Sequence, residues 1–475
     1  MSGRAVLLVL LAFFLPVHAL HGATALPSQV GKLLRKHKIP GSALSVYVQD
    51  VTNTRPTLAW RANTPRNPAS TIKLLTTFAA MDVLGPAYTW KTSALAHGPM
   101  RDGYLEGDLV LKGGGDPFLV TEKMWKFLRE LRDTGLSHIA GDLVIDDGVF
   151  SPEPEDPAAF DGKPHRSYNA QPNALLVNFQ TVRFTFDPDD LNRRVEIITS
   201  PRLANLTVRN RLRYASGSCR GSFRRMKMDV EDDDAGGTVT FAGKYPEGCG
   251  RASINRVVLR PTAKAYGVFR ELWEGMGGTL EGSLRIGETP PDAREITTFE
   301  SPSMSEVVRR VNKFSNNVMA RTLLLTLGAE AYGEPGTYEK GRRAMGDWLA
   351  AKRLDLPGLR VDNGAGLSRD SRITARAMAQ LLLAAYQSPY QPEFMASLPL
   401  AGMDGTMHRR LRESPLAGRA HIKTGSLDDV SAGAGYVLSS SNKLYVVVVF
   451  LNHEGLRRTT AKAIQDEVLN WVYAR

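Results

Sequence analysis

The sequence contains little cysteine: only Cys219 and Cys249 occur among its 475 residues. Neither has the neighbours of a metal-binding cluster or belongs to a C-x-x-C redox pair, so we expect no metal centre and no cofactor. In an oxidising compartment an even pair of cysteines is readily bridged. A disulfide is therefore the favoured interpretation, and two free buried thiols are the alternative.

Long apolar runs are also scarce. The run near the start, Ala5 to Leu15, follows the positive charge of Arg4 and is too short to span a bilayer comfortably. Small residues that fit a cleavage site come next, at 17–19 and 23–25. The pattern predicts a signal peptide over residues 1–25 and export to the periplasm, with an uncleaved anchor as the alternative. No later stretch is long and apolar enough to predict a transmembrane anchor.

The remaining composition is that of an ordinary globular chain, with 43% hydrophobic and 23% charged residues. The formal net charge is +11, but lysine and arginine are scattered and no nucleic-acid-binding module is recognisable, so we expect no nucleic-acid partner. A basic surface suits anionic cell-wall polymers, although a well-solvated surface is the simpler interpretation.

The first chemical motif is Ser70 followed three residues later by Lys73. Paired strands are expected at 43–49 and 57–61, and a helix is expected to start at Pro68, because apolar residues then recur at helical spacing. Positions i and i+3 share a helix face, so the lysine can reach the serine oxygen and act as the base that a hydroxyl nucleophile needs. A second S-x-x-K, Ser440 to Lys443, lies in an expected hairpin turn and is interpreted as a solvated turn.

The second motif is Ser315-Asn316-Asn317. It interrupts a helical region that opens with a capping-box pattern at Ser303 to Glu306 and resumes over 318–327. At such a break, polar side chains can point into a cleft without disrupting a regular element. A helix-capping turn is the alternative interpretation.

The third motif is Lys423-Thr424-Gly425. It lies on the first of three expected antiparallel strands, at 420–426, 430–438 and 444–451, which a helix over 460–473 follows. A lysine beside a hydroxyl suits a substrate carboxylate, and the glycine leaves room for substrate against the strand. The alternative is an exposed edge strand protected by a lysine.

The order S-x-x-K, S-x-N, K-T-G matches the penicillin-recognising serine enzymes. Within them the sequence resembles the D-alanyl-D-alanine carboxypeptidase/endopeptidase family typified by penicillin-binding protein 4, the class C low-molecular-mass type. The long separation of Ser70 from Ser315 fits the two-part insertion of that family. The resemblance covers nearly the whole mature chain and is carried by Ala69–Lys73, Gly114–Pro117, Ser315–Asn317, Gly364–Arg369, Leu400–Thr406 and His421–Leu427.

The resemblance implies roles for the residues of the three motifs. Ser70 would attack the carbonyl between two D-alanines or in a D-alanyl cross-link, and Lys73 would take its proton. Ser315 would relay a proton to the leaving amine, and Asn317 would orient the substrate and Lys73. Water would then hydrolyse the acyl-enzyme, and β-lactams would acylate the same serine as covalent inhibitors.

The third motif has binding roles by the same resemblance. Lys423 would supply positive potential, and Thr424 would bind the substrate carboxylate, with Gly425 and Ser426 beside it. The backbone N–H groups of Ser70 and Ser426 would form the oxyanion hole.

The resemblance also implies stem-peptide recognition by Arg369 and by Asp146 or Phe150. Two departures from the family pattern leave the stem-peptide preference open, namely Asp428 in place of glutamine and Gly364-Ala365-Gly366 in place of Gly-Ser-Gly.

We therefore expect a mixed α/β fold. A transpeptidase/β-lactamase-like domain, with a mostly antiparallel central sheet flanked by helices, would be built from residues 26–90 and 296–475. An inserted domain, 91–164 and 261–295, would itself contain a β-rich domain at 165–260.

The expected function is that of a serine DD-peptidase acting on peptidoglycan stem peptides. A β-lactamase or esterase on the same scaffold and a non-catalytic cell-wall-binding protein are the alternatives, and the oligomeric state is left open.

Overall fold

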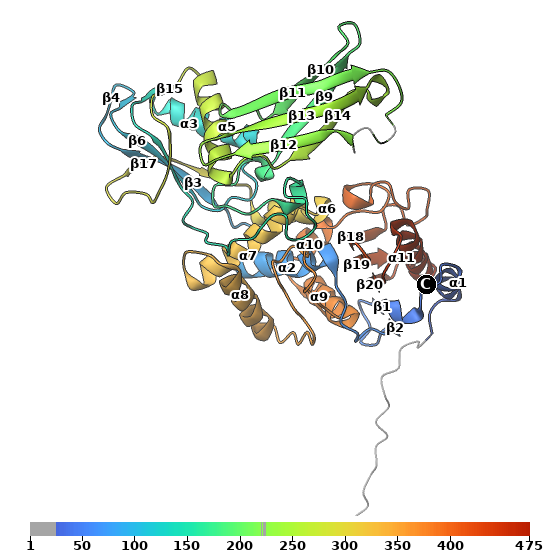
Figure 1. Cartoon of the computed structure of the whole chain (residues 1–475). Coiled ribbons are helices and arrows are strands. Elements are labelled where there is room, and N and C mark those ends of the chain that lie inside the picture. The colour runs from blue at the N-terminus through green and yellow to red at the C-terminus, as the bar shows by residue number, and fades with distance from the viewer. Residues whose placement is uncertain (1–24, 220, 222–224) are drawn as a thin grey trace, which may run out of the picture.

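A computed structural model describes residues 25–219, 221 and 225–475. The predicted signal peptide lies outside the described residues except for its last position. Figure 1 shows two bodies: one holds both ends of the described chain, and the other is formed by the middle of the chain. Within the described ranges, none of the helices combines the length and the hydropathy that crossing a bilayer requires.

The first body is built on a five-stranded sheet in which every neighbouring pair is antiparallel, as predicted. The sequence places its first two strands near the N-terminus and the other three near the C-terminus, so the sheet joins the two ends of the chain. In sheet order the strands are β18 (Ala420–Leu427), β19 (Val430–Leu438), β20 (Leu444–Asn452), β1 (Leu44–Asp50) and β2 (Leu58–Trp60).

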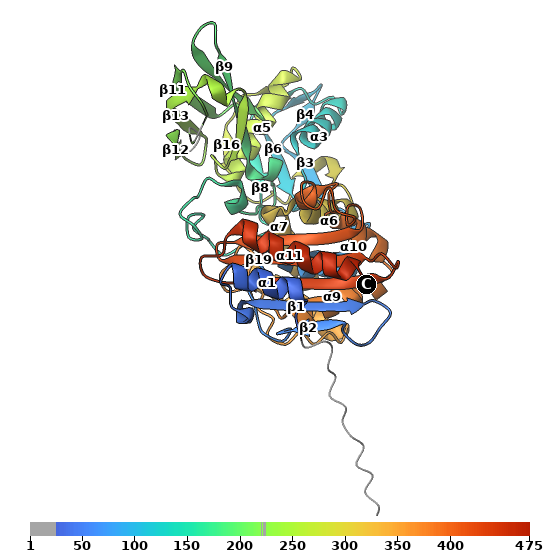
Figure 2. The same cartoon turned by 90° about the vertical axis from the view of Figure 1, so that its right-hand side faces the viewer.

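Both faces of this sheet are covered by helices, because alternate residues of its strands point to opposite sides. On β20, Val446, Val448 and Phe450 pack into the larger hydrophobic core, and their neighbours Val447 and Val449 pack into a second one. Helices α1 (Ser28–Lys36) and α11 (Arg458–Tyr473) cover the second core and lie together across one face in Figure 2.

The opposite face is covered by a larger group of helices. Helix α6 begins at Met304 behind the predicted capping box of Ser303 and Glu306. The helices on this face are α2 (Lys73–Leu84), α6 (Met304–Phe314), α7 (Asn317–Tyr332), α8 (Tyr338–Ala351), α9 (Ala375–Gln387) and α10 (Gln391–Ser397).

The middle of the chain forms four further sheets around one shared core, in which Phe184 and Phe241 of the β-rich part meet Phe269 of α5. The largest of these sheets has, in order, β16 (Leu284–Ile286), β8 (Leu143–Asp146), β6 (Asp108–Gly113), β3 (Lys91–His97) and β17 (Arg294–Glu300). A second sheet of short strands has β15 (Thr279–Leu280), β7 (His138–Ile139), β5 (Tyr104–Leu105) and β4 (Met100–Arg101). The two sheets of the β-rich part have β10 (Arg194–Ser200), β9 (Val182–Asp189) and β14 (Ala252–Arg256) in one, and β11 (Leu206–Ala215), β13 (Gly237–Pro246) and β12 (Lys227–Asp232) in the other. Helices α3 (Thr121–Asp133) and α5 (Pro261–Gly275) pack on them.

A disulfide joins Cys219 and Cys249. It connects the segments that follow β11 and β13, two strands that run parallel to each other with Ala215 opposite Pro246. The favoured interpretation of the two cysteines is therefore confirmed.

Candidate active site

Ser70 lies on a tight turn rather than on the expected α-helix. Residues Ala69–Ile72 form a 3-10 turn, η2, and the α-helix α2 begins only at Lys73. Ala69 has a φ of +45°, and its N–H donates to the Asn67 side chain over 2.9 Å. In a 3-10 turn the side chains at i and i+3 lie one above the other, so Ser70 and Lys73 are neighbours here as they would be on an α-helix.

Lys73 is fully buried and makes three polar contacts. Its Nζ lies 3.1 Å from Ser70 Oγ and 2.7 Å from Asn317 Oδ1, and it also contacts the Ala365 carbonyl. Burial first, and then the charges of Lys423 and Arg321, hold the pKa of Lys73 well below the ordinary lysine range. A neutral amine keeps two N–H donors for Asn317 and Ala365 and can turn its lone pair to the Ser70 hydroxyl.

The Ser315–Asn317 turn joins α6 to α7, and it both caps a helix and presents polar side chains to the site. Asn316 caps α7 by accepting from the Met319 N–H over 3.1 Å. Ser315, at a left-handed φ of +58°, and Asn317 present their side chains to the two lysines. Asn317 also donates to the Tyr168 carbonyl over 3.0 Å, which connects the site to the inserted segment.

The Lys423-Thr424-Gly425 motif lies on a strand, β18, as expected, and this strand forms one edge of the sheet. Lys423 is fully buried, and its Nζ donates to Ser315 Oγ and to the Thr424 carbonyl, each over 2.9 Å. Burial lowers the pKa of Lys423 to about 7. A Cβ on Gly425 would lie 2.9 Å from the Ser70 nitrogen, so only glycine lets this strand approach the turn so closely.

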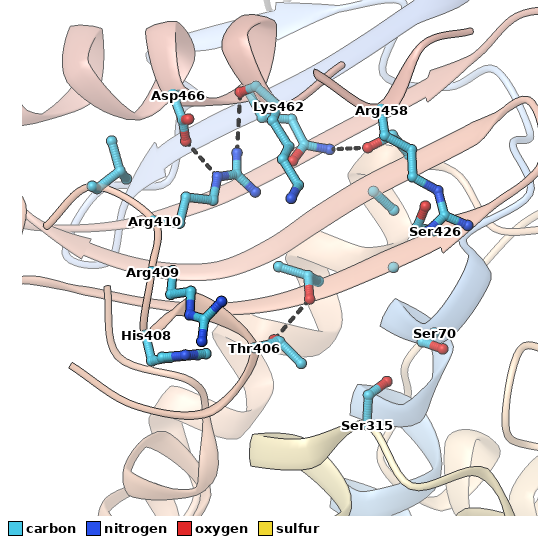
Figure 3. Close-up of a pocket in the computed structure, with 16 residues that line it drawn as sticks. Ser70, Ser315, Thr406, His408, Arg409, Arg410, Ser426, Arg458, Lys462 and Asp466 are labelled. Carbon is cyan, nitrogen blue, oxygen red and sulfur yellow. Dashed lines mark hydrogen bonds and ion pairs between the residues drawn. The ribbon is translucent and has the colours of Figure 1, made fainter. Parts of the chain in front are cut away.

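The three motifs meet at one cavity of about 640 Å³. Figure 3 shows Ser70 and Ser315 near each other at one end, with Ser426 on the strand above them. A hydroxyl beside a buried amine, next to a second serine that a second buried lysine contacts, is an arrangement that can carry out acyl transfer. Across the described ranges, no group of three or more His, Cys, Asp or Glu side chains is placed to hold a metal ion.

The residues expected to recognise the stem peptide lie elsewhere. Arg369 lines a separate cavity of about 340 Å³, where its guanidinium stacks over Phe160 at 5.0 Å. Asp146, at the end of β8, accepts hydrogen bonds from the Thr289 and Gly148 N–H groups. Phe150 is buried in the larger hydrophobic core. None of the three lines the cavity that holds Ser70.

Comparison with known families shows to which family the chain belongs. The sequence profile described as the D-Ala-D-Ala carboxypeptidase 3 (S13) family matches residues 26–474. The chain belongs to this family. It is therefore a serine-type DD-carboxypeptidase, and the family resemblance drawn from the three motifs is confirmed.

Individual relatives and solved structures agree with this family assignment. The chain is 30% identical over 469 residues to the D-alanyl-D-alanine carboxypeptidase of Actinomadura sp. strain R39, an alignment that covers 94% of this chain and 84% of the relative. Penicillin-binding protein 4 of Haemophilus influenzae superposes with a TM-score of 0.78 at 22% identity, covering 94% of this chain and 99% of the other. The structural likeness shows that the fold is shared.

Sequence reasoning missed three contributors to this S13 site. The Ala365 carbonyl contacts Lys73, Thr406 hydrogen-bonds Thr424 over 2.8 Å, and the Tyr168 carbonyl holds Asn317. Ala365 and Thr406 lie in segments that carry the family resemblance, so those segments could have pointed to them. Tyr168 contributes only a backbone oxygen, so no residue type in the sequence marks it.

Gly366→Ala is expected to destabilise the protein and inactivate it. Gly366 has a φ of +75°, and a Cβ there would overlap the carbonyl of Ala69, next to Ser70. We expect a loss of about 2–4 kcal/mol in unfolding free energy from the combined strain and overlap. Thermal unfolding and D-alanine release measure the two effects.

The matched control is Gly346→Ala in α8, where an added Cβ has open space and which should stay active and equally stable or slightly more so. Normal stability and activity of Gly366→Ala would show that the Ala69–Gly366 contact does not hold the turn.

Proposed function

We propose that the chain is an exported, periplasmic serine DD-peptidase that cleaves D-alanyl-D-alanine ends and D-alanyl cross-links of peptidoglycan through an acyl-enzyme on Ser70. The observation that carries the proposal is the buried Lys73 amine, 3.1 Å from Ser70 Oγ, with Asn317 and the Ala365 carbonyl holding it in place. The export proposal draws on the N-terminal segment, and the Cys219–Cys249 disulfide suits an oxidising compartment.

In the acylation step, Ser70 Oγ attacks the carbonyl carbon of the penultimate D-alanine while its proton passes to the neutral Lys73 amine. Backbone N–H groups of Ser70 and Ser426 stabilise the resulting oxyanion. As the C–N bond breaks, Ser315 passes a proton to the leaving amine, which departs as D-alanine or as the amine of a cross-linked peptide.

The 2.9 Å hydrogen bond from Lys423 to Ser315 supports this relay, because it connects the serine to a proton donor. Water then adds to the ester carbonyl and releases the shortened peptide.

The substrate carboxylate is proposed to bind at β18. The Thr424 hydroxyl borders the cavity, and Lys423 supplies positive potential from behind it. β-Lactams carry a comparable carboxylate and would acylate Ser70, and one Haemophilus influenzae penicillin-binding protein 4 structure holds a β-lactam. Arg369 remains a proposed contact of the stem peptide, whereas the carboxylate of Asp146 is already engaged by Thr289 and Gly148.

Digestion of purified muropeptides with the full mature protein tests the proposal. Mass spectrometry should show pentapeptides losing one alanine and cross-linked dimers converting to monomers, and a fluorescent penicillin should label the protein covalently. Rapid turnover of the penicillin without a persistent label would favour a β-lactamase. Binding to peptidoglycan without alanine release or cross-link cleavage would favour a non-catalytic wall-binding protein.

The pH dependence of kcat/KM for a small acyl-D-Ala-D-Ala peptide is expected to be bell-shaped. Raising the pH through about 7 removes the proton from free Lys423 and with it the positive potential for the carboxylate. On the acid side kcat/KM falls because Lys73 becomes protonated and can no longer act as the base. This limb lies well below the ordinary lysine range, because burial and the charge of Lys423 lower the pKa of Lys73. The two limbs belong to the coupled pair.

A bound carboxylate favours the Lys423 ammonium, so the alkaline limb of kcat should lie at higher pH than that of kcat/KM. Initial rates of D-alanine release across the pH range measure both limbs. A kcat/KM that does not decline above neutrality would show that binding does not require the Lys423 charge.

A further inference from the structure

The cavity that holds Ser70 continues past Thr424 to a second, basic end. This end is bordered by the segment from His408 to Leu411 and by one side of α11. Arg458 and Lys462 of α11 stand four residues apart and therefore share a helix face. Figure 3 shows Lys462 and Arg458 above the strands, with the end of Arg458 near Ser426, and Arg409 beside His408 on the side of Thr406.

Most of the positive charge at this end has no acidic partner. Asp466 is the one carboxylate among the described residues that line the cavity, and Arg410 already engages it over 2.6 Å. Arg409, Arg458 and Lys462 are exposed and form no ion pair with any residue in the described ranges. Lys462 also lies close enough to Asp466 for its charge to lower the pKa of that carboxyl, but one carboxylate does not balance the four cations around it. The remaining positive charge favours an anionic ligand there.

We propose that this basic end, bounded by Arg409, Arg458 and Lys462, is a subsite for the carboxylates of the second peptide in a cross-linked substrate. The inference rests on the proposed function, because it takes the leaving group to lie on the Thr424 side of Ser70. A D-alanine leaving group ends at its own carboxylate and does not reach past Thr424. In a cross-link the leaving amine belongs to another stem peptide, which extends further and carries additional carboxylates.

The subsite therefore selects for cross-links over free pentapeptide ends. Ion pairs of guanidinium and ammonium groups with those carboxylates would form only with the dimeric substrate. Their contribution should weaken as salt is added, because the cations are exposed to solvent.

The double variant Arg458→Gln/Lys462→Gln of the full mature protein tests the subsite. We expect kcat/KM for a soluble cross-linked muropeptide dimer to fall about tenfold or more, since two charge-assisted contacts are lost. D-Alanine release from a monomeric pentapeptide and the rate of acylation by penicillin should stay at the parent values. The dimer reaction of the variant should also become less sensitive to salt.

Arg457→Gln is the matched control, because Arg457 is exposed, adjacent in sequence and absent from the cavity lining. An equal fall with both substrates, no fall with the dimer, or the same fall in Arg457→Gln would overturn the subsite. A fall seen only with intact cell-wall sacculi would assign these cations to an anionic wall polymer and overturn it too.

Failure of the proposed function would look different from failure of the subsite. A parent protein that binds no penicillin and leaves both substrates intact contradicts the function itself. A parent protein that trims the pentapeptide and leaves the dimer uncut overturns the subsite and the endopeptidase part of the function, while the carboxypeptidase part stands. A parent protein that cuts both substrates, with a double variant that cuts both at the parent rates, overturns the subsite alone.

Discussion

Ser70→Ala is expected to lose both D-alanine release and covalent penicillin labelling, with activity reduced by at least about 10⁴-fold, as for other serine nucleophiles. Ser70 Oγ lies 3.1 Å from the Lys73 amine, and the Ser70 backbone lies against Gly425 of β18, whereas the other serine of the motifs, Ser315, accepts a hydrogen bond from Lys423. The side chain is small and partly exposed, so the fold should persist. Gel fluorescence after labelling and a D-alanine assay measure the loss, and thermal unfolding verifies the fold.

Ser440→Ala is the matched control for this variant. Ser440 opens the second S-x-x-K of the sequence, and the structure places it in the exposed turn between β19 and β20. This variant should label and cleave at the parent rate. If Ser70→Ala instead labelled normally, the assignment of the nucleophile would be wrong.

Lys73→Met is expected to slow acylation by about 10³-fold, within the range contributed by a general base. Methionine retains most of the buried volume but cannot accept the Ser70 proton. Lys73→Arg should be similarly slow, because a guanidinium does not deprotonate in proteins. Stopped-flow measurement of penicillin acylation gives the rates, and circular dichroism verifies that both variants are folded.

Lys264→Met provides the control for losing a buried lysine. Lys264 is as buried as Lys73, but its amine donates to the Thr181 carbonyl within the core of the inserted part. A folded Lys264→Met protein should acylate at the parent rate. Acylation of Lys73→Met at the parent rate would mean that another group takes the serine proton.

Much of the fold follows from local sequence patterns. The segments 420–426, 430–438 and 444–451 predict three consecutive antiparallel strands, and the structure has them at Ala420–Leu427, Val430–Leu438 and Leu444–Asn452. The α6 capping box and the paired cysteines were likewise predictable, because each depends on residue types at short or known spacing. The start of α2 was predicted wrongly, since Ala69 adopts a positive φ and its carbonyl lies where only a residue without a Cβ, the distant Gly366, leaves room for it.

The pairing of Ser70 with Lys73 needs only a spacing of three, which both an α-helix and a 3-10 turn preserve. Other features of the site depend on contacts between segments that are distant in sequence. These features are the hydrogen bond of Lys423 with Ser315 and the contacts of the Ala365 and Tyr168 carbonyls. The absence of Asp146 from the lining of the Ser70 cavity has the same origin. The motif residues can thus be recognised in the sequence. Their burial, and with it the lowered pKa of the two lysines, arises only when the sheet, α7 and the inserted segment close around them.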